Sequence, residues 1–342
     1  MKKFKKVTQV LLISTMFGFL YGQELEGKEE ETPTFSVSGS VDTYMRYNLS
    51  NDFDAAPGTS FANLSGFSLG MANVILGFEG EKSGFVADLV YGPRGADAVF
   101  GSVGNSSSII NQMYVYFSVG ENTTLTIGNF NTFLGYEVIS PVANFNYSTS
   151  YMFSYGPFSH TGIKADFSLS DKSSLMIGVL NPTDMTESNP NDTYLLGVQF
   201  GFSGQYINYL GGQGYSQIDY TGGFNLSESF FLGINATSAS NNTPDGGFSG
   251  LALYPQLTLS DSFSLGLRGE VFSDKKDFTG VFENASGDAD NTSITLTGSY
   301  SSGNMILKPE IRIDSASEKI FKDGLGASDN LASFVIAAIY SF

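Results

Sequence analysis

The stretch TFSVSGSVDTYMRYN, residues 34–48, decides the fold, because its apolar and polar side chains alternate with a period of two. The two faces comprise Phe35, Val37, Val41 and Met45 on the apolar side and Ser36, Ser38, Ser40, Asp42 and Arg46 on the polar side. Successive side chains of a β-strand point to opposite faces. The pattern therefore predicts a strand with one face toward lipid and one toward water.

The N-terminus carries a predicted signal peptide over residues 1–22. Four lysines within the first six residues precede the apolar run Val10–Leu20, which is the order of a secretory signal. The run is too short for a membrane-spanning helix, which takes about twenty apolar residues. Residues 23–33 are acidic and predict a flexible leader. Because no other long apolar stretch follows, a helical bundle is excluded for a membrane protein with this sequence.

The same alternation recurs down the chain and predicts sixteen strands. The candidate ranges are 34–48, 67–80, 83–92, 108–119, 123–130, 159–170, 173–182, 192–203, 205–211, 216–226, 229–238, 247–260, 262–273, 290–301, 304–314 and 330–342. The hairpin over 205–216 is the weakest and is alternatively part of a loop. The predicted fold class is all-β: a transmembrane antiparallel up-and-down β-barrel of about 16 strands, formed by residues 34–342 in a bacterial outer membrane.

Connection lengths favour a membrane barrel over a soluble sandwich. Tight turns such as Asp171–Lys172 and Asp261–Ser262 alternate with long connections, as expected for short periplasmic turns and long outer loops. The long set comprises 50–65, 93–107, 131–158, 182–191, 273–289 and 315–329. The loop at 131–158 is too aromatic for a solvated tip. We expect it to fold into the lumen and narrow the pore; the alternative is that it caps the outside.

Composition excludes several classes of function. The chain has 40 Gly, 30 Phe and 18 Tyr, which favour strands and turns, and it has no Cys, which excludes a disulfide framework or a thiolate metal site. Removal of the four signal lysines leaves 13 basic residues against 34 acidic ones, a net charge of about −21. Nucleic acid is therefore not an expected partner. No metal and no cofactor is predicted.

The C-terminal stretch LASFVIAAIYSF, residues 331–342, predicts a strand that stops at the last residue. Its apolar face comprises Phe334, Ile336, Ala338, Tyr340 and Phe342. A terminal Phe342 with Tyr340 two places before it is typical of the segment read by the outer-membrane barrel-assembly machinery. An ordinary closing strand would explain the alternation, but it gives no reason for the chain to end there.

The segment GNFNTFLGYEVISPVANFNYSTSYMFSYGPFSHTGIKADF, residues 128–167, resembles the OmpL-like β-barrel porin family. The resemblance is carried by Gly135, Tyr136, Glu137, Asn144, Asn146, Tyr147, Ser148, Gly156, Pro157, His160, Thr161 and Gly162. A second similarity is ILKPEIRID, residues 306–314. The resemblance implies a porin fold and passive solute passage, and it supplies no catalytic or binding residues.

Charged residues on the polar faces of the strands are candidates for the pore wall, since an Arg or Lys facing lipid near the midplane costs about 2–4 kcal/mol. These pore-lining candidates are Asp42, Arg46, Lys164, Asp166, Arg268, Glu270, Lys308, Glu310, Arg312 and Asp314, together with Glu137 from the loop at 131–158. They either create a transverse field that selects solutes or form a salt-bridged network that supports the wall. Glu137 is either part of an acidic eyelet or a carboxylate that binds a backbone turn.

A catalytic site is not predicted. The single histidine, His160, would need a Ser and an orienting partner to form a hydrolytic site of the outer-membrane phospholipase kind. We predict an outer-membrane porin for small hydrophilic solutes, either cation-preferring or weakly selective. The alternative is a non-conducting barrel that acts as a surface binding or adhesion protein. Expected partners are outer-membrane lipid, lipopolysaccharide, the barrel-assembly machinery and small solutes, with a homotrimer as a further option.

Overall fold

The computed structural model describes residues 33–50, 61–99, 107–189, 191–242, 245–281, 287–323 and 326–342. The predicted signal peptide (1–22) and the leader up to residue 32 lie outside the described residues. Within them, no helix is both long enough and apolar enough to cross a membrane.

Nearly all of the regular structure is β-strand. The elements are β1 (Thr34–Asn48), β2 (Gly66–Glu79), β3 (Ser83–Tyr91), α1 (Pro93–Ala98), a 3₁₀ turn η1 (Ser107–Ile109), β4 (Ile110–Gly120), β5 (Thr123–Asn131), α2 (Tyr151–Ser154), β6 (Ser159–Ser170), β7 (Ser173–Leu180), β8 (Leu195–Phe202), β9 (Gln205–Gly212), β10 (Tyr215–Asn225), β11 (Phe230–Asn242), β12 (Asp245–Ser260), β13 (Phe263–Lys275), β14 (Ala289–Ser302), β15 (Met305–Ala316), β16 (Phe321–Asp323), β17 (Gly326–Ser328) and β18 (Asn330–Ser341).

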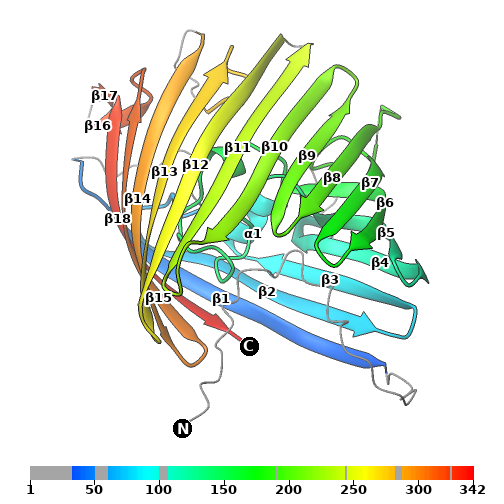
Figure 1. Cartoon of the computed structure of the whole chain (residues 1–342). Helices are drawn as coiled ribbons and strands as arrows, with labels where there is room; N and C mark the ends of the chain where they lie inside the picture. Colours follow the sequence, from blue (N-terminus) through cyan, green and yellow to red (C-terminus); the bar gives the residue numbers. More distant parts are fainter. Residues whose placement is uncertain are drawn as a thin grey trace.

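Sixteen of these strands form one closed antiparallel barrel, in which β1 to β15 pair in chain order and β18 joins β15 to β1 (Figure 1). The remaining two, β16 and β17, form a separate two-stranded sheet. The predicted fold class and strand number are therefore confirmed. The hairpin over 205–216 is also real, because Gly212 and Tyr215 pair across the turn between β9 and β10.

The last residue of the chain closes the barrel. Strand β18 pairs with β1 from Ser40 opposite Ser341 to Asn48 opposite Ser333. Beyond this ladder, the backbone N–H of Gly39 donates to the carbonyl of Phe342 at 3.1 Å, and the N–H of Phe342 donates to Gly39 at 3.0 Å. Closure pairs the edge strands with each other, which a membrane requires because lipid cannot hydrogen-bond an open edge.

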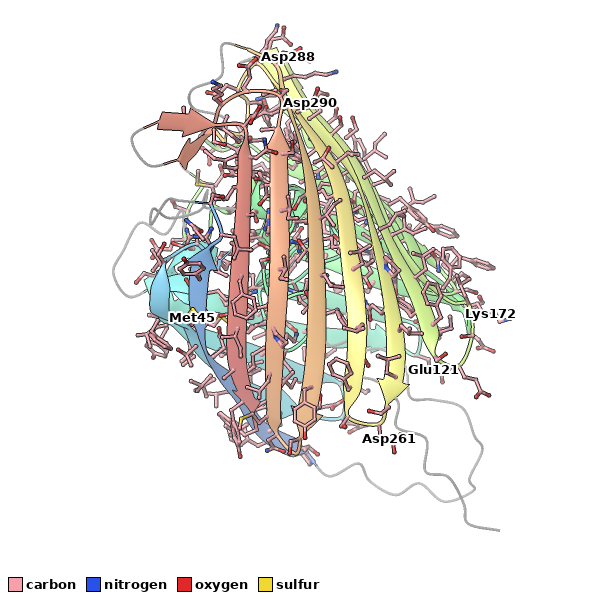
Figure 2. The ribbon with its side chains drawn as sticks, turned by 90° about the vertical axis from the view of Figure 1, so that its left-hand side faces the viewer. Met45, Glu121, Lys172, Asp261, Asp288 and Asp290 are labelled. Carbon is pink, nitrogen blue, oxygen red and sulfur yellow. The ribbon has the colours of Figure 1, made fainter. Side chains whose placement is uncertain are left out.

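The strands follow the predicted alternation. On β13, Leu267 and Val271 are exposed on the outer face, whereas Arg268 and Glu270 are buried on the inner face. The turns that contain Glu121, Lys172 and Asp261 lie at one end of the barrel, and Asp288 and Asp290 lie at the other (Figure 2). The prediction that outer connections are long fails between β9 and β10, which are joined by the two residues 213–214 with positive φ at both.

Candidate functional site

Residues 132–158, which connect β5 to β6, lie inside the barrel and are called the inserted loop here. Their aromatic side chains stack on inward-facing rings of distant strands. The ring of Tyr136 lies 4.3 Å from that of Tyr254 on β12, and the ring of Tyr147 lies 5.6 Å from that of Tyr44 on β1. These two contacts hold the inserted loop against β12 and β1 of the barrel wall.

Acidic side chains of this wall accept hydrogen bonds from the backbone of the inserted loop. The bonds are Tyr147 N to Glu310 Oε2 at 2.8 Å, Ser148 N to Glu310 Oε1 at 3.1 Å, Tyr151 N to Glu270 Oε2 at 2.8 Å and Met152 N to Glu270 Oε1 at 2.8 Å. The carboxylate of Asp219 on β10 takes the same role for Gly135 N at 3.0 Å. Each carboxylate thus satisfies amide groups that irregular backbone leaves without a ladder partner.

Basic side chains satisfy the carbonyl groups of the same segment. The bonds are Lys308 Nζ to Pro141 O at 2.9 Å, Arg312 Nη1 to Thr149 O at 2.8 Å, Arg268 Nη1 to Ser148 O at 2.5 Å and Arg94 Nε to Ile139 O at 2.9 Å. Lys308 also donates to Asn144 O. A buried loop is normally disfavoured because its backbone polar groups lack partners. Here the charged wall supplies those partners.

The strand register explains how the sequence builds this wall. On β15, the alternation in KPEIRID places Lys308, Glu310, Arg312 and Asp314 on the inner face, while Ile311 and Ile313 are exposed outside. Acidic side chains outnumber basic ones among the buried charged residues that the structure describes. The basic ones are Arg46, Arg94, Arg268, Lys308 and Arg312, and the acidic ones are Asp42, Asp88, Glu137, Asp184, Asp219, Glu270, Asp274, Glu310 and Asp314. Burial of charge is tolerable only when it is paired and hydrogen-bonded in this way.

Four inward-facing glycines form sockets for large side chains of the inserted loop. A Cβ added at the glycine would lie within 3 Å of the loop side chain in every case: Gly197 against Phe133, Gly233 against Tyr136, Gly250 against Met152 and Gly266 against Phe145. A glycine inside a strand often marks such a close approach. These sockets were not predicted, although each glycine lies inside a predicted strand, a position that often indicates such a close approach.

Nine of the eleven predicted pore-lining residues are buried in this network. Glu137 binds Arg268 through Oε1 at 2.6 Å, and its Oε2 accepts the N–H of Ser150 at 2.6 Å. The hydroxyl of Tyr147 donates to Asp42 at 2.5 Å. Arg46, Arg268, Glu270, Lys308, Glu310, Arg312 and Asp314 are likewise covered. These side chains face the lumen side of the sheet, but they hold protein rather than line open water.

Lys164 and Asp166 on β6 differ from the other nine. Lys164 Nζ lies 2.8 Å from Asp166 Oδ2, and the side chains keep 23% and 42% of their exposure. Both sit on the inner face of the sheet, because Ile163, next to Lys164 on the strand, is exposed on the outer face. The half-buried Tyr114 and Tyr116 on β4 and Tyr206 on β9 share this part of the inner surface.

Both ends of the inserted loop are fixed. At its start, the Thr132 hydroxyl and His160 Nε2 are 2.9 Å apart. At its end, Asp184 accepts the N–H groups of Phe158 at 2.8 Å and Ser159 at 2.9 Å. Burial raises the pKa of the Asp184 carboxyl to about 7, although the two amide bonds act in the opposite direction. Asp184 lies in the connection after β7, where no periodic pattern of the sequence indicates its role.

His160 lies among side chains that do not suit hydrolysis. Its ring lies 5.0 Å from that of Phe133 and 6.4 Å from that of Phe130, and its hydrogen-bond partner is Thr132. A hydrolytic histidine needs a nucleophile and a carboxylate or equivalent group that orients the imidazole. The surroundings of His160 therefore match a structural role at the base of the inserted loop.

Comparison with known proteins relates this architecture to porins. The family described as "Putative beta-barrel porin-2, OmpL-like" matches residues 34–342. The anion-selective porin of Comamonas acidovorans is 12% identical, with a TM-score of 0.58 over 91% of this chain and 100% of that one. A loop L8 deletion mutant of OmpT, an outer membrane protein of Vibrio cholerae, is 13% identical, with a TM-score of 0.55 over 91% and 99%. No curated protein matches the sequence significantly.

Proposed function

Because this chain belongs to the OmpL-like β-barrel porin family of the bacterial outer membrane, we propose that it passes small hydrophilic solutes by passive diffusion, with the inserted loop narrowing the pore. The observation that carries the proposal is the uneven seating of the inserted loop. Its charged anchors lie on β1, β10 and β12–β15, and its first residues also contact β7–β9, whereas Lys164 and Asp166 on β6 stay partly accessible to water. A solute path then runs past the inner face of β4–β6.

Weak ion selectivity fits this arrangement better than cation preference. Most of the buried acidic side chains are covered from the lumen and are held by hydrogen bonds or ion pairs within the protein, so permeating ions reach little of their charge. The carboxylate of Glu137 faces Arg268 rather than the lumen. Lys164 and Asp166 also compensate each other. Pore selectivity depends on the charged groups that permeating ions can reach.

Single-channel recording of the refolded protein in a planar bilayer tests the proposal. Stable open steps in KCl, with a reversal potential near zero in a salt gradient, are the expected result. A barrel that is folded by circular dichroism and heat-modifiable migration but never conducts would overturn the diffusion channel. Strong cation preference would contradict the proposed weak selectivity but would still support the proposed diffusion channel.

A second candidate function is a plugged barrel that binds a partner at the cell surface. The observation in its favour is apolar packing within the lumen, where Leu134 of the inserted loop packs with Phe130, Leu180, Leu195 and Leu210 of the wall. A plugged barrel is expected to have such an apolar inner surface, whereas an aqueous channel has a polar one. Absence of conductance in the experiment above would favour this candidate.

Assembly partners follow from the C-terminal strand. Tyr340 on the outer face of β18 and Phe342, the residue after the strand, are exposed, where the barrel-assembly machinery could read them before closure. We propose that residues 1–22 direct export and that residues 34–342 then insert as one domain beside outer-membrane lipid and lipopolysaccharide. A homotrimer, with contacts through the apolar outer face, would be detected by mass measurement in detergent.

A further inference from the structure

The ion pair of Lys164 and Asp166 is open to solvent in a wall where the other predicted charges are covered. The Nζ–Oδ2 distance is 2.8 Å, and Lys164 Nζ also lies 5.3 Å from the ring centroid of Phe130. Residues two apart on a strand share a face, so one backbone segment presents both charges side by side. Both groups lie in the middle of β6, well inside the two ends of the barrel.

A glycine lies directly beside Lys164 on the neighbouring strand. Lys164 pairs across the sheet with Gly178 on β7, and Gly178 pairs with Gly197 on β8. Gly178 has no side chain, and Gly197 is the socket that receives Phe133 of the inserted loop. Gly178 therefore adds no side-chain bulk directly beside Lys164, while the ring of Phe133 covers Gly197 on the next strand. Lys164 and Asp166 keep 23% and 42% of their side-chain exposure, so a solute in the lumen can reach both charges.

We propose that Lys164 and Asp166 form the charge-selectivity element of the channel and favour zwitterionic solutes, a class that includes amino acids. An exposed ion pair contributes little to stability, so each partner can exchange its bond for one to a solute at small cost. A zwitterion offers a carboxylate to Lys164 and an ammonium group to Asp166 at the same time. A simple cation or anion gains one attraction and meets one repulsion.

The inference rests on the proposed function, and reversal potentials test it separately. In vesicle-derived planar bilayers of phosphatidylcholine, Lys164→Gln should raise the cation-to-anion permeability ratio, and Asp166→Asn should lower it. A unit charge in water changes the local concentration of a monovalent ion by about threefold at about 6–7 Å. Shifts of about threefold or more, in opposite directions, are therefore expected for the two variants.

Matched controls lie in the turn that follows the same strand. Asp171 and Lys172 are both exposed, and Lys172 lies at the end of the barrel away from Asp288 and Asp290 (Figure 2). Asp171→Asn and Lys172→Gln change the net charge equally and should leave the permeability ratio of the wild type. If all variants conduct and neither Lys164→Gln nor Asp166→Asn changes the permeability ratio, the selectivity role of the pair is overturned but the proposed channel function is not. If the folded wild type does not conduct, both proposals are overturned.

Solute uptake tests whether the channel favours zwitterionic solutes. Glycine and its uncharged isomer glycolamide have the same mass and similar size, so liposome swelling compares them directly. The wild type should admit glycine faster, relative to glycolamide, than the double variant Lys164→Gln/Asp166→Asn does. An equal ratio for the wild type and the double variant would show that the pair does not recognise zwitterions.

Discussion

Arg268 and Glu137 form a fully buried ion pair, with 2.6 Å between Nη1 and Oε1, that ties the middle of β13 to the inserted loop. The same guanidinium group donates to the Ser148 carbonyl, and the second oxygen of Glu137 accepts the N–H of Ser150. The pair therefore joins two distant parts of the inserted loop to one point on the wall. On the nearby strand β15, Glu310 accepts the N–H of Tyr147, and Arg312 donates to the carbonyl of Thr149.

Arg268→Gln should destabilise the barrel, because removal of one partner leaves a buried carboxylate unpaired, which costs about 3–5 kcal/mol. A loosened inserted loop should also enter the remaining lumen from time to time, and single-channel records should show frequent brief closures. Glu137→Gln should have a smaller effect, because an amide oxygen can still accept from Ser150 and the guanidinium of Arg268 keeps its bonds to Ser148 and Thr295. Lys172→Gln, at an exposed turn, is the control. If Arg268→Gln leaves the denaturant midpoint unchanged and its single-channel records show no additional closures, Arg268 does not anchor the inserted loop.

The glycine sockets predict a second effect on conductance. Gly266→Val would create a steric clash with Phe145, since an added Cβ lies 2.3 Å from Cε1 of its ring, far closer than van der Waals contact allows. Overpacking of this kind costs about 1–3 kcal/mol. It should push Phe145 toward the free lumen and lower the single-channel conductance.

Gly269 on the same strand supplies the matched control. A Cβ at Gly269 meets no atom within 4 Å, so Gly269→Val should leave conductance unchanged. Equal conductance of the Gly266→Val and Gly269→Val proteins would mean that the socket does not position the inserted loop.

The sequence alone predicted the barrel but not what its inward-facing charged side chains contact. Strand alternation fixed which side of β15 is inward, because lipid cannot accept Lys308 or Arg312. It did not reveal what those residues contact, because their partners lie far away in the chain. Glu310 and Tyr147 are separated by 163 positions, and the carboxylate binds a backbone amide that every residue has. Periodicity carries no information about contacts between a strand and an irregular loop.

Phe342→Ala should reduce assembly in cells without weakening the refolded barrel. The backbone of Phe342 pairs with Gly39 and would keep doing so, whereas its side chain is 55% exposed and contributes little to packing. Phe202→Ala is the matched control, because Phe202 is equally exposed, at 55%, on another strand. Two quantities are measured for each variant: the amount of heat-modifiable protein in outer-membrane fractions, and the thermal midpoint of the refolded protein. Equal membrane yields for the two variants would remove the assembly role of Phe342.

Asp184 predicts a pH dependence whose sign follows from its environment. Burial raises the pKa of its carboxyl from an ordinary value of 3.8 to about 7 in the folded protein. Between about pH 7 and about pH 4, the folded state therefore binds a proton that the unfolded state does not, and linkage makes the folded state more stable as pH falls. The contribution is complete below the unfolded pKa and is lost as pH rises through about 7.

Asp184→Asn should remove this dependence, because an amide does not titrate over the range and its oxygen can still accept the N–H groups of Phe158 and Ser159. Urea midpoints at pH 5 and pH 8 measure it: the wild type should lose more stability between the two values than Asp184→Asn does. Asp171→Asn, in an exposed turn, should behave as the wild type. If the wild type and Asp184→Asn lose the same stability from pH 5 to pH 8, the carboxyl does not titrate there, and the end of the inserted loop is held independently of pH.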